Sequence, residues 1–148
     1  MVESPETLPE VQAAARWWTE LLRGPVINDS KNDYADVLKT LKDGEREPLS
    51  DEVLDKFYEY ACLTIGTHVN RGSWRYDEPE FGSYVRAIQN DYSPDPALEA
   101  AAQKAGIRDL YFRMPWKTVM WVNPGEVKVS YGYGAPIEVI YSSAPVVA

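Results

Sequence analysis

The sequence has very few residues of the kinds that build disulfides and metal sites. Its 148 residues include one cysteine, Cys62, and one histidine, His68. A single cysteine excludes an internal disulfide and any cysteine-based zinc site. One histidine in addition leaves too few nitrogen and sulfur ligands for a typical metal site within one chain. These scarcities favour an intracellular protein that holds no metal and no cofactor.

Long hydrophobic runs are also missing, and the first residues do not predict a secretory leader. No run approaches the roughly eighteen apolar residues that a membrane span needs. The first ten residues, MVESPETLPE, are acidic and lack the apolar centre of a signal peptide. The length and the hydrophobic content of 45% predict one globular domain over residues 1–148. We therefore expect a cytoplasmic protein without membrane contact.

Positive charge is scarce in the first part of the chain. Residues 1–60 carry fourteen acidic and seven basic side chains, a net charge of −7, whereas residues 61–148 carry nine and eight, a net of −1. Nonspecific nucleic-acid binding depends on Lys and Arg contacts to phosphates, so this balance argues against direct nucleic-acid binding. The acidic part would suit a basic partner, with Asp36 and Asp43 as candidate contacts. The alternative is a solvated face that keeps the protein soluble.

A hairpin pattern dominates the C-terminal part, from Met114 to Tyr141. Two alternating runs flank a turn, Asn123–Glu126, in which Pro124 presets one φ angle and Gly125 tolerates a positive one. A two-residue loop would bring apolar partners onto one face, since side chains alternate along a strand. The pairs on that face would be Val122 with Val127, Met120 with Val129, Thr118 with Tyr131, and Trp116 with Tyr133.

The other face of this hairpin is mixed and suited to contact with water, because it pairs Trp121 with Lys128 and Val119 with Ser130. An L-Pro-Gly pair is not the preferred tight hairpin turn, so a loop longer by one or two residues stays open. The open end of the hairpin is a candidate aromatic pocket, with core packing as the alternative for its inward-facing members. The residues of this candidate pocket are Trp116, Lys117, Tyr131 and Tyr133.

Helical signals fill the acidic part, residues 1–65. Thr7-Leu8-Pro9-Glu10 is typical of a capping box at the start of a helix that Gly24-Pro25 ends. A second helix is predicted from Asp33 to Leu41. A third begins at Ser50, the N-cap, with acidic residues next to it at the positive end of the helix dipole.

The rest of the chain predicts an irregular segment, a helix and the sheet. Residues 66–94 lack a sustained period, apart from a short helix near Phe81–Gln89 whose apolar side chains would point inward. Asp95 caps a helix over 95–106. Residues 107–141 form the antiparallel sheet, with Ile107–Met114 and Ile137–Tyr141 as further strands, and 142–148 form a frayed tail. The predicted fold class is α+β, about four helices packed on a small antiparallel sheet centred on the C-terminal β-hairpin.

Candidate chemistry is confined to binding. Cys62 and His68 are six residues apart on one predicted helix and no motif surrounds them, so we expect no catalytic residues and no enzyme. A compact cationic and aromatic cluster follows that helix. Guanidinium groups bind phosphate or carboxylate and an indole offers a stacking face, so the cluster suits a nucleotide or an acidic loop. Pairing with the acids at 77–80 is the alternative. The cluster consists of Arg71, Trp74, Arg75 and Tyr76.

The last sixty residues carry a recognisable signature. PWKTVMWV followed by KVSYGYGAPIEVIY, after a segment from Asp91 to Ile107, resembles the C-terminal part of small bacteriophage and prophage accessory proteins. That class includes inhibitors of host defence such as anti-CRISPR proteins. The resemblance implies a non-enzymatic inhibitor in the cytoplasm of a bacterial host cell, which binds a host defence protein with a basic surface. The alternatives are a protein that sequesters a small nucleotide signal and, third, a small enzyme.

The hairpin pairing can be tested by placing a charge on its apolar face. We expect Met120→Asp to lower the free energy of unfolding by about 3–5 kcal/mol, because it buries an unpaired carboxylate. Denaturant unfolding of the variant and the wild type measures this difference. Wild-type stability in the variant would show that Met120 was assigned to the wrong face.

Overall fold

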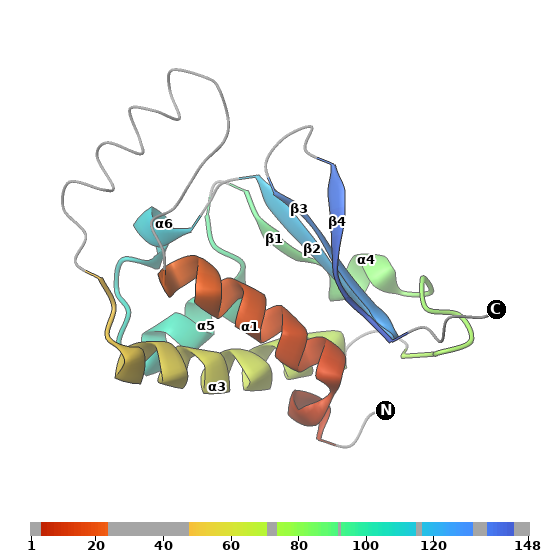
Figure 1. The fold of residues 1–148 in the computed structure, drawn as a ribbon, viewed down its shortest axis with the longest axis horizontal. Helices are drawn as coiled ribbons and strands as arrows, with labels where there is room; N and C mark the ends of the chain where they lie inside the picture. The colour runs from red at the N-terminus through yellow and green to blue at the C-terminus, as the bar shows by residue number, and fades with distance from the viewer. Residues whose placement is uncertain are drawn as a thin grey trace.

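The structure, a computed structural model, describes residues 4–23, 48–70, 74–91, 93–114, 117–131 and 136–143 (Figure 1). The predicted helix from Asp33 to Leu41 lies outside these residues. None of the described helices is long and apolar enough to cross a membrane. The described elements are, in order, η1 (Pro5–Thr7), α1 (Pro9–Arg23), α3 (Asp51–Val69), α4 (Ser83–Arg86), β1 (Ile88–Asn90), α5 (Pro96–Ala105), α6 (Leu110–Arg113), β2 (Thr118–Asn123), β3 (Glu126–Tyr131) and β4 (Ile137–Ser142).

The four described strands form one antiparallel sheet in the order β1-β2-β3-β4. The predicted register of the hairpin is confirmed, with Val122 opposite Val127 and Met120 opposite Val129. Its loop is the two-residue one, because Asn123 and Glu126 are already paired. Gly125 has a φ of +82°, the positive value for which glycine is suited.

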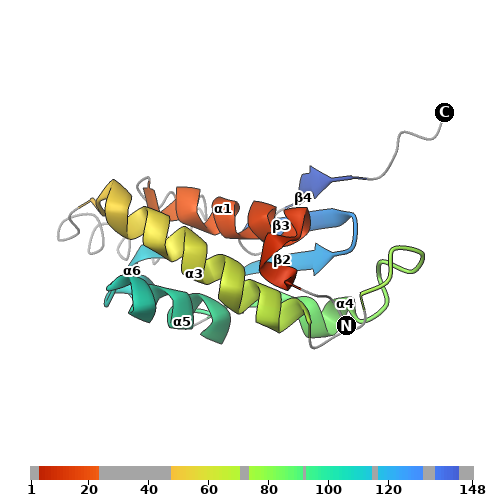
Figure 2. The same ribbon diagram turned by 90° about the horizontal axis from the view of Figure 1, so that it is seen from below.

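Helices cover one side of this sheet. Figures 1 and 2 show α1, α3 and α5 gathered on that side, with α4 at one end of the strands. The apolar face of the β2–β3 hairpin points toward this helical layer, and its four central side chains are fully buried: Met120, Val122, Val127 and Val129. The predicted α+β class, helices on a small antiparallel sheet, is therefore confirmed. That residues 1–148 form a single domain stays a prediction.

Two helices begin at the caps that the sequence predicted. The Val53 amide donates to Ser50 Oγ (3.2 Å) at the start of α3. The Ala97 amide donates to Asp95 Oδ1 (2.9 Å) at the start of α5, and the Gln89 amide donates to the other carboxylate oxygen (3.0 Å). Asp95 therefore also joins α5 to strand β1.

The predicted capping box at the start of α1 is wrong. Thr7 Oγ1 donates to the Ser4 carbonyl (2.8 Å) and belongs to the 3-10 turn η1, so the helix begins two residues later, at Pro9. The Glu10 side chain does not reach back to the helix start. It is 1% exposed and binds groups that lie far away in the sequence.

Two other local predictions are wrong. The predicted strand Ile107–Met114 contains the helix α6, whose last residue, Arg113, donates to Asp109 Oδ1 four residues earlier (2.8 Å) and so favours a helical turn. The predicted helix near Phe81–Gln89 is helical only over Ser83–Arg86, and its last residues join the sheet as β1.

The apolar side chains of that second segment point outward, contrary to prediction. Phe81, Tyr84 and Val85 are 50%, 86% and 45% exposed, although Ile88 is buried as predicted. Arg86 is fully buried in their place, because the interior offers it several carbonyl acceptors. Hydrogen-bond acceptors rather than hydrophobicity decide which side of α4 faces inward.

The double role of Asp95 predicts an unequal cost for two cap substitutions. Ser50→Ala removes one cap bond at an exposed helix start and should lower the free energy of unfolding by about 1 kcal/mol. Asp95→Ala also leaves the Gln89 amide without its acceptor, so the expected loss is about 2–3 kcal/mol. Denaturant unfolding of both variants gives the comparison. Equal losses would show that the bond to β1 contributes nothing.

Candidate docking surface

Exposed apolar side chains are concentrated on two parts of the described chain. Half of its large exposed hydrophobic side chains lie between residues 76 and 85, and two more lie on the edge strand β4. Aromatic and aliphatic groups that remain exposed together mark candidate interaction surfaces. The residues are Tyr76, Phe81, Tyr84, Val85, Ile137 and Val139.

The sheet face that points away from the helices connects these two parts. Trp121 on β2 pairs with Lys128 on β3, which pairs with Val139 on β4, so the three side chains form one row across this outer sheet face. Trp121 and Lys128 are partly buried, as expected for a face that meets water. We call the exposed side chains of residues 76–85, together with this row, the docking surface.

Arg86 fixes the segment that contains α4 beside Trp121. Strand β1 pairs only with Thr118–Met120 of β2, and Arg86 borders the rest of that edge. Its guanidinium donates to the Val122 carbonyl (2.9 Å) and to Asn123 Oδ1 (2.9 Å) on β2. It also donates to the carbonyls of residues 79 and 81, at 2.8 and 2.9 Å. The fork of one side chain thus joins the α4 segment to the strand that carries Trp121.

The electrostatics of Arg86 reflect this burial. Burial lowers the pKa of Arg86 from its usual value, whereas the nearby carboxylate of Glu80 acts in the opposite direction. The guanidinium also lies over the ring of Trp74, 5.5 Å from its centroid. The buried side chain is therefore held by carbonyl oxygens, an amide oxygen and an aromatic face.

An ion pair links the same segment to the outer sheet face. Lys128 Nζ lies 3.2 Å from Glu80 Oε1 and 3.6 Å from Glu126 Oε1. Both acids are substantially exposed, so solvent weakens these interactions and each contributes little stability. They bring the Glu80 carboxylate to Lys128, which is the neighbour of Trp121 in the row.

A buried carboxylate on α1 binds Tyr76 of the docking surface and the turn between β2 and β3. Glu10 Oε2 accepts from the Tyr76 hydroxyl (3.0 Å) and from the backbone amide of Gly125 (2.8 Å). Burial of the phenol raises the pKa of Tyr76, and the bond to Glu10 acts in the same direction. Helix α1 is thereby joined to the 76–85 segment and to the turn between β2 and β3.

The structure brings together the described members of the predicted cationic and aromatic cluster. Trp74 and Tyr76 make an edge-to-face contact with ring centroids 6.1 Å apart. Arg75 lies over the ring of Phe81 (4.8 Å) and 3.6 Å from the carboxylate of Glu78, which is the local acid pairing that the sequence left open. Arg71 lies outside the described residues. A binding role for this cluster stays a prediction.

The predicted aromatic pocket at the open end of the hairpin is described only in part. Trp116 and Tyr133 lie outside the described residues, as do Asp36 and Asp43 of the predicted acidic surface. Lys117 has a φ of +61°, and its Nζ lies 2.8 Å from Asp91 Oδ1. Tyr131 makes an edge contact with Trp17, with ring centroids 6.1 Å apart. Their binding role stays a prediction.

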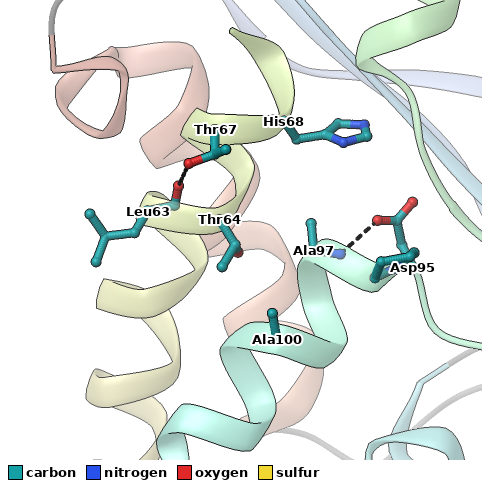
Figure 3. Close-up of a pocket in the computed structure, with 8 residues that line it drawn as sticks. Leu63, Thr64, Thr67, His68, Asp95, Ala97 and Ala100 are labelled. Carbon is teal, nitrogen blue, oxygen red and sulfur yellow. Dashed lines mark hydrogen bonds between the residues drawn. The ribbon is translucent and has the colours of Figure 1, made fainter. Parts of the chain in front are cut away.

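A separate cavity of about 340 Å³ lies between α3 and the first half of α5 (Figure 3). Its polar side chains already have partners inside the protein. Thr67 Oγ1 donates to the Leu63 carbonyl (3.0 Å), Asp95 caps α5, and His68 Nε2 lies 2.8 Å from the Ala87 carbonyl oxygen. These engaged groups suit a structural role.

The described residues do not suggest metal or thiol chemistry. They contain no group of three or more His, Cys, Asp and Glu side chains that could hold a metal ion. Cys62 is buried, and burial raises the pKa of its thiol and so disfavours the reactive thiolate.

Glu10 and Arg86 were not identified from the sequence as residues that organise this surface, although the sequence pattern contains a signal for each. Glu10 precedes the buried residues Ala14 and Trp18 by four and eight positions, so it lies on the apolar side of α1. Arg86 precedes the buried Ile88 by two positions in a chain that is entering a strand. A charged residue at a position that periodicity places inside is the pattern that could have identified both.

Comparison with known proteins identifies a family. The sequence model of the BTG family matches residues 35–141. Chicken (Gallus gallus) BTG1 is 34% identical over 99 residues, which are 66% of this chain and 58% of that protein. A BTG family protein of Dictyostelium discoideum is 29% identical over 129 residues, which are 86% of this chain and 26% of that protein.

A solved structure has the same fold. The FOG-3 BTG/Tob domain of C. elegans, in a doubly substituted form, superimposes with a TM-score of 0.66 and covers 90% of this chain and 88% of that domain. Its sequence identity is 16%, so this likeness supports the fold alone. The chain spans little more than half the length of chicken BTG1.

These findings correct the interpretation drawn from the C-terminal signature. The resemblance to bacteriophage accessory proteins is wrong, because the matching proteins are eukaryotic BTG and Tob proteins. The predicted anti-CRISPR-like inhibition of a host defence system is wrong for the same reason. So are the predicted partners, a basic host defence protein and a small nucleotide, and the predicted location in a bacterial host cell. The signature had been assigned to the wrong proteins.

The hydrogen bonds of Arg86 predict a large loss of stability when its guanidinium is removed. We expect Arg86→Met to lower the free energy of unfolding by about 3–5 kcal/mol, because several buried acceptors lose their donor. Arg75→Met is the matched control, since this arginine is half exposed and should cost less than about 1 kcal/mol. Denaturant unfolding measures both, and similar losses would contradict the role given to Arg86.

Proposed function

The chain belongs to the BTG family, and from this premise we propose that it is an adaptor that binds a deadenylase of the CAF1 kind. Through that contact it regulates the removal of poly(A) tails from transcripts, and with it cell proliferation. The single observation that carries this proposal is the family match over residues 35–141, which includes all of the docking surface.

Membership of this family also confirms the prediction that the chain is not an enzyme, because BTG/Tob proteins are non-catalytic adaptors. An adaptor acts by holding another protein, so its effect depends on the affinity and geometry of one surface. In the proposed complex the deadenylase supplies the chemistry. This chain supplies the surface that positions the deadenylase.

We place the deadenylase contact on the docking surface. Protein interfaces are enriched in aromatic side chains at their centres, and truncating a central tryptophan often costs much of the binding free energy. Trp121 has that position here, because the α4 segment lies on one side of it and Lys128 and Val139 lie on the other. Tyr84, at 86% exposed, is the largest outward-facing side chain of the neighbouring helix.

The surface is also well formed before any partner binds. Arg86 holds the α4 segment against β2, and hydrogen bonds in the sheet hold Trp121 and Val139 at fixed spacing. A preformed surface loses little conformational entropy on binding, so more of the contact energy appears as affinity. These features support the docking surface over the α3–α5 cavity.

Truncation of Trp121 tests this proposal. We expect Trp121→Ala to weaken binding to a purified CAF1-type deadenylase by about 30-fold or more, which corresponds to about 2 kcal/mol, because it empties the centre of the interface. Isothermal titration calorimetry measures the affinity. A deadenylation assay on a polyadenylated RNA then reports whether the complex changes the rate of tail removal.

Leu63→Ala is the matched control for this experiment. Leu63 is an apolar residue that is 50% exposed, but unlike Trp121 it lies on α3 at the α3–α5 cavity. Its truncation should leave the affinity unchanged. Equal weakening by both variants would contradict the location of the interface, and failure of the wild-type chain to bind would contradict the proposed function itself.

A further inference from the structure

We propose that Glu10 is a positioning residue for the docking surface: it sets the affinity for the deadenylase without touching it. Its carboxylate holds the segment 76–85 and the β2–β3 turn in a fixed relation from the opposite side of the sheet. This inference rests on the proposed function of the docking surface. It concerns a residue that lies before the residues matched by the family model, 35–141.

The geometry gives Glu10 contact with Tyr76 of the docking surface and with the turn that joins the strands carrying Trp121 and Lys128. One oxygen, Oε2, accepts from the Tyr76 hydroxyl, 66 residues away in sequence, and from the Gly125 amide, 115 residues away. Glu10 itself is 1% exposed, so a protein bound to the docking surface would not reach it. A single atom therefore joins three segments that are distant in the chain.

Each of these contacts continues toward Arg86. Tyr76 packs edge-on against Trp74, whose ring lies beneath the Arg86 guanidinium. Gly125 lies two residues after Asn123 in the turn, and Asn123 Oδ1 accepts a hydrogen bond from the Arg86 guanidinium. Glu10 and Arg86 thus bind the same two segments, and the exposed α4 residues Tyr84 and Val85 lie in sequence between Tyr76, which Glu10 binds, and Arg86.

The charge of Glu10 is not explained by stability alone. The second carboxylate oxygen, Oε1, is buried and has no hydrogen-bond partner in the described part of the structure. Removing a carboxylate from water is costly, so a neutral isostere of Glu10 avoids that cost while it weakens the two bonds, and these two effects on stability oppose each other. What the ionised group adds is stronger bonds to Tyr76 and Gly125, because charge-assisted hydrogen bonds exceed neutral ones.

Glu10→Gln separates positioning from stability. Glutamine keeps the size of the side chain and its acceptor oxygen but weakens both bonds. We expect its affinity for a purified CAF1-type deadenylase to fall about tenfold, while the denaturant midpoint stays unchanged or rises. A merely structural role predicts that affinity and stability fall together, so that result would overturn the proposal.

Glu20→Gln is the matched control, because it removes the same charge from the same helix. Glu20 is exposed and pairs with Arg23 at 3.1 Å, away from the docking surface. The affinity of the Glu20→Gln variant for the deadenylase should equal that of the wild type. An equal loss in both variants would assign the effect to net charge and overturn the proposal.

A double-mutant cycle tests the route through the phenol. Tyr76→Phe removes only the donor to Glu10 and keeps the ring against Trp74. If Glu10 acts through Tyr76, the double variant should lose clearly less affinity than the two single losses combined. Full additivity would overturn the route and leave Tyr76 as an ordinary contact residue.

Hydrogen exchange provides a readout that needs no partner. In Glu10→Gln, the amides of residues 76–78, of residues 80–86 and of Gly125 should exchange about tenfold faster, while those of α5 keep their wild-type rates. Unchanged exchange at these amides would overturn the positioning role whether or not the deadenylase binds. If the wild-type chain fails to bind while exchange responds as expected, the proposed function fails and the positioning role of Glu10 is retained.

Discussion

The burial of one face of the β2–β3 hairpin beneath the helices is the contact on which the rest of the structure depends. Met120, Val122, Val127 and Val129 are fully shielded from water there. Because side chains alternate along a strand, burying these four commits Trp121 and Lys128 to the opposite face. The docking surface is therefore a consequence of the core: a slip of one residue in the hairpin would bury the surface and expose the core.

Local patterns predicted this hairpin and the caps because their causes lie within a few residues. A Pro-Gly turn between alternating runs specifies pairing and faces together, and Ser50 and Asp95 each bind an amide two or three residues ahead. The α+β class follows from these elements. Strand β1 was missed because three residues are too few to display a period, and its pairing partner lies thirty residues away.

The parts that could not be predicted depend on partners distant in sequence. Glu10 has the position of the last residue of a capping box. In the folded protein its carboxylate instead accepts hydrogen bonds from the Tyr76 hydroxyl and the Gly125 amide. The Arg86 side chain points inward because carbonyl oxygens from two segments surround its guanidinium. The apolar side chains of Phe81, Tyr84 and Val85 therefore point outward. Of the predicted site residues that the structure describes, Tyr76 alone lies on the proposed docking surface. Trp121 had only been placed on the correct face.

The position of β4 at the edge of the sheet has a consequence for the behaviour of the protein in solution. An edge strand is a template for pairing with another strand, and Glu138 is the one charged residue of β4, which contains no lysine and no proline to discourage such pairing. Two of its side chains, Ile137 and Val139, are more than half exposed. The net charge of −8 supplies the opposing force, since copies of the chain repel one another. The tendency of the protein to self-associate thus depends on two opposing effects, pairing through β4 and repulsion between the negatively charged copies. Salt screens the repulsion and therefore favours self-association.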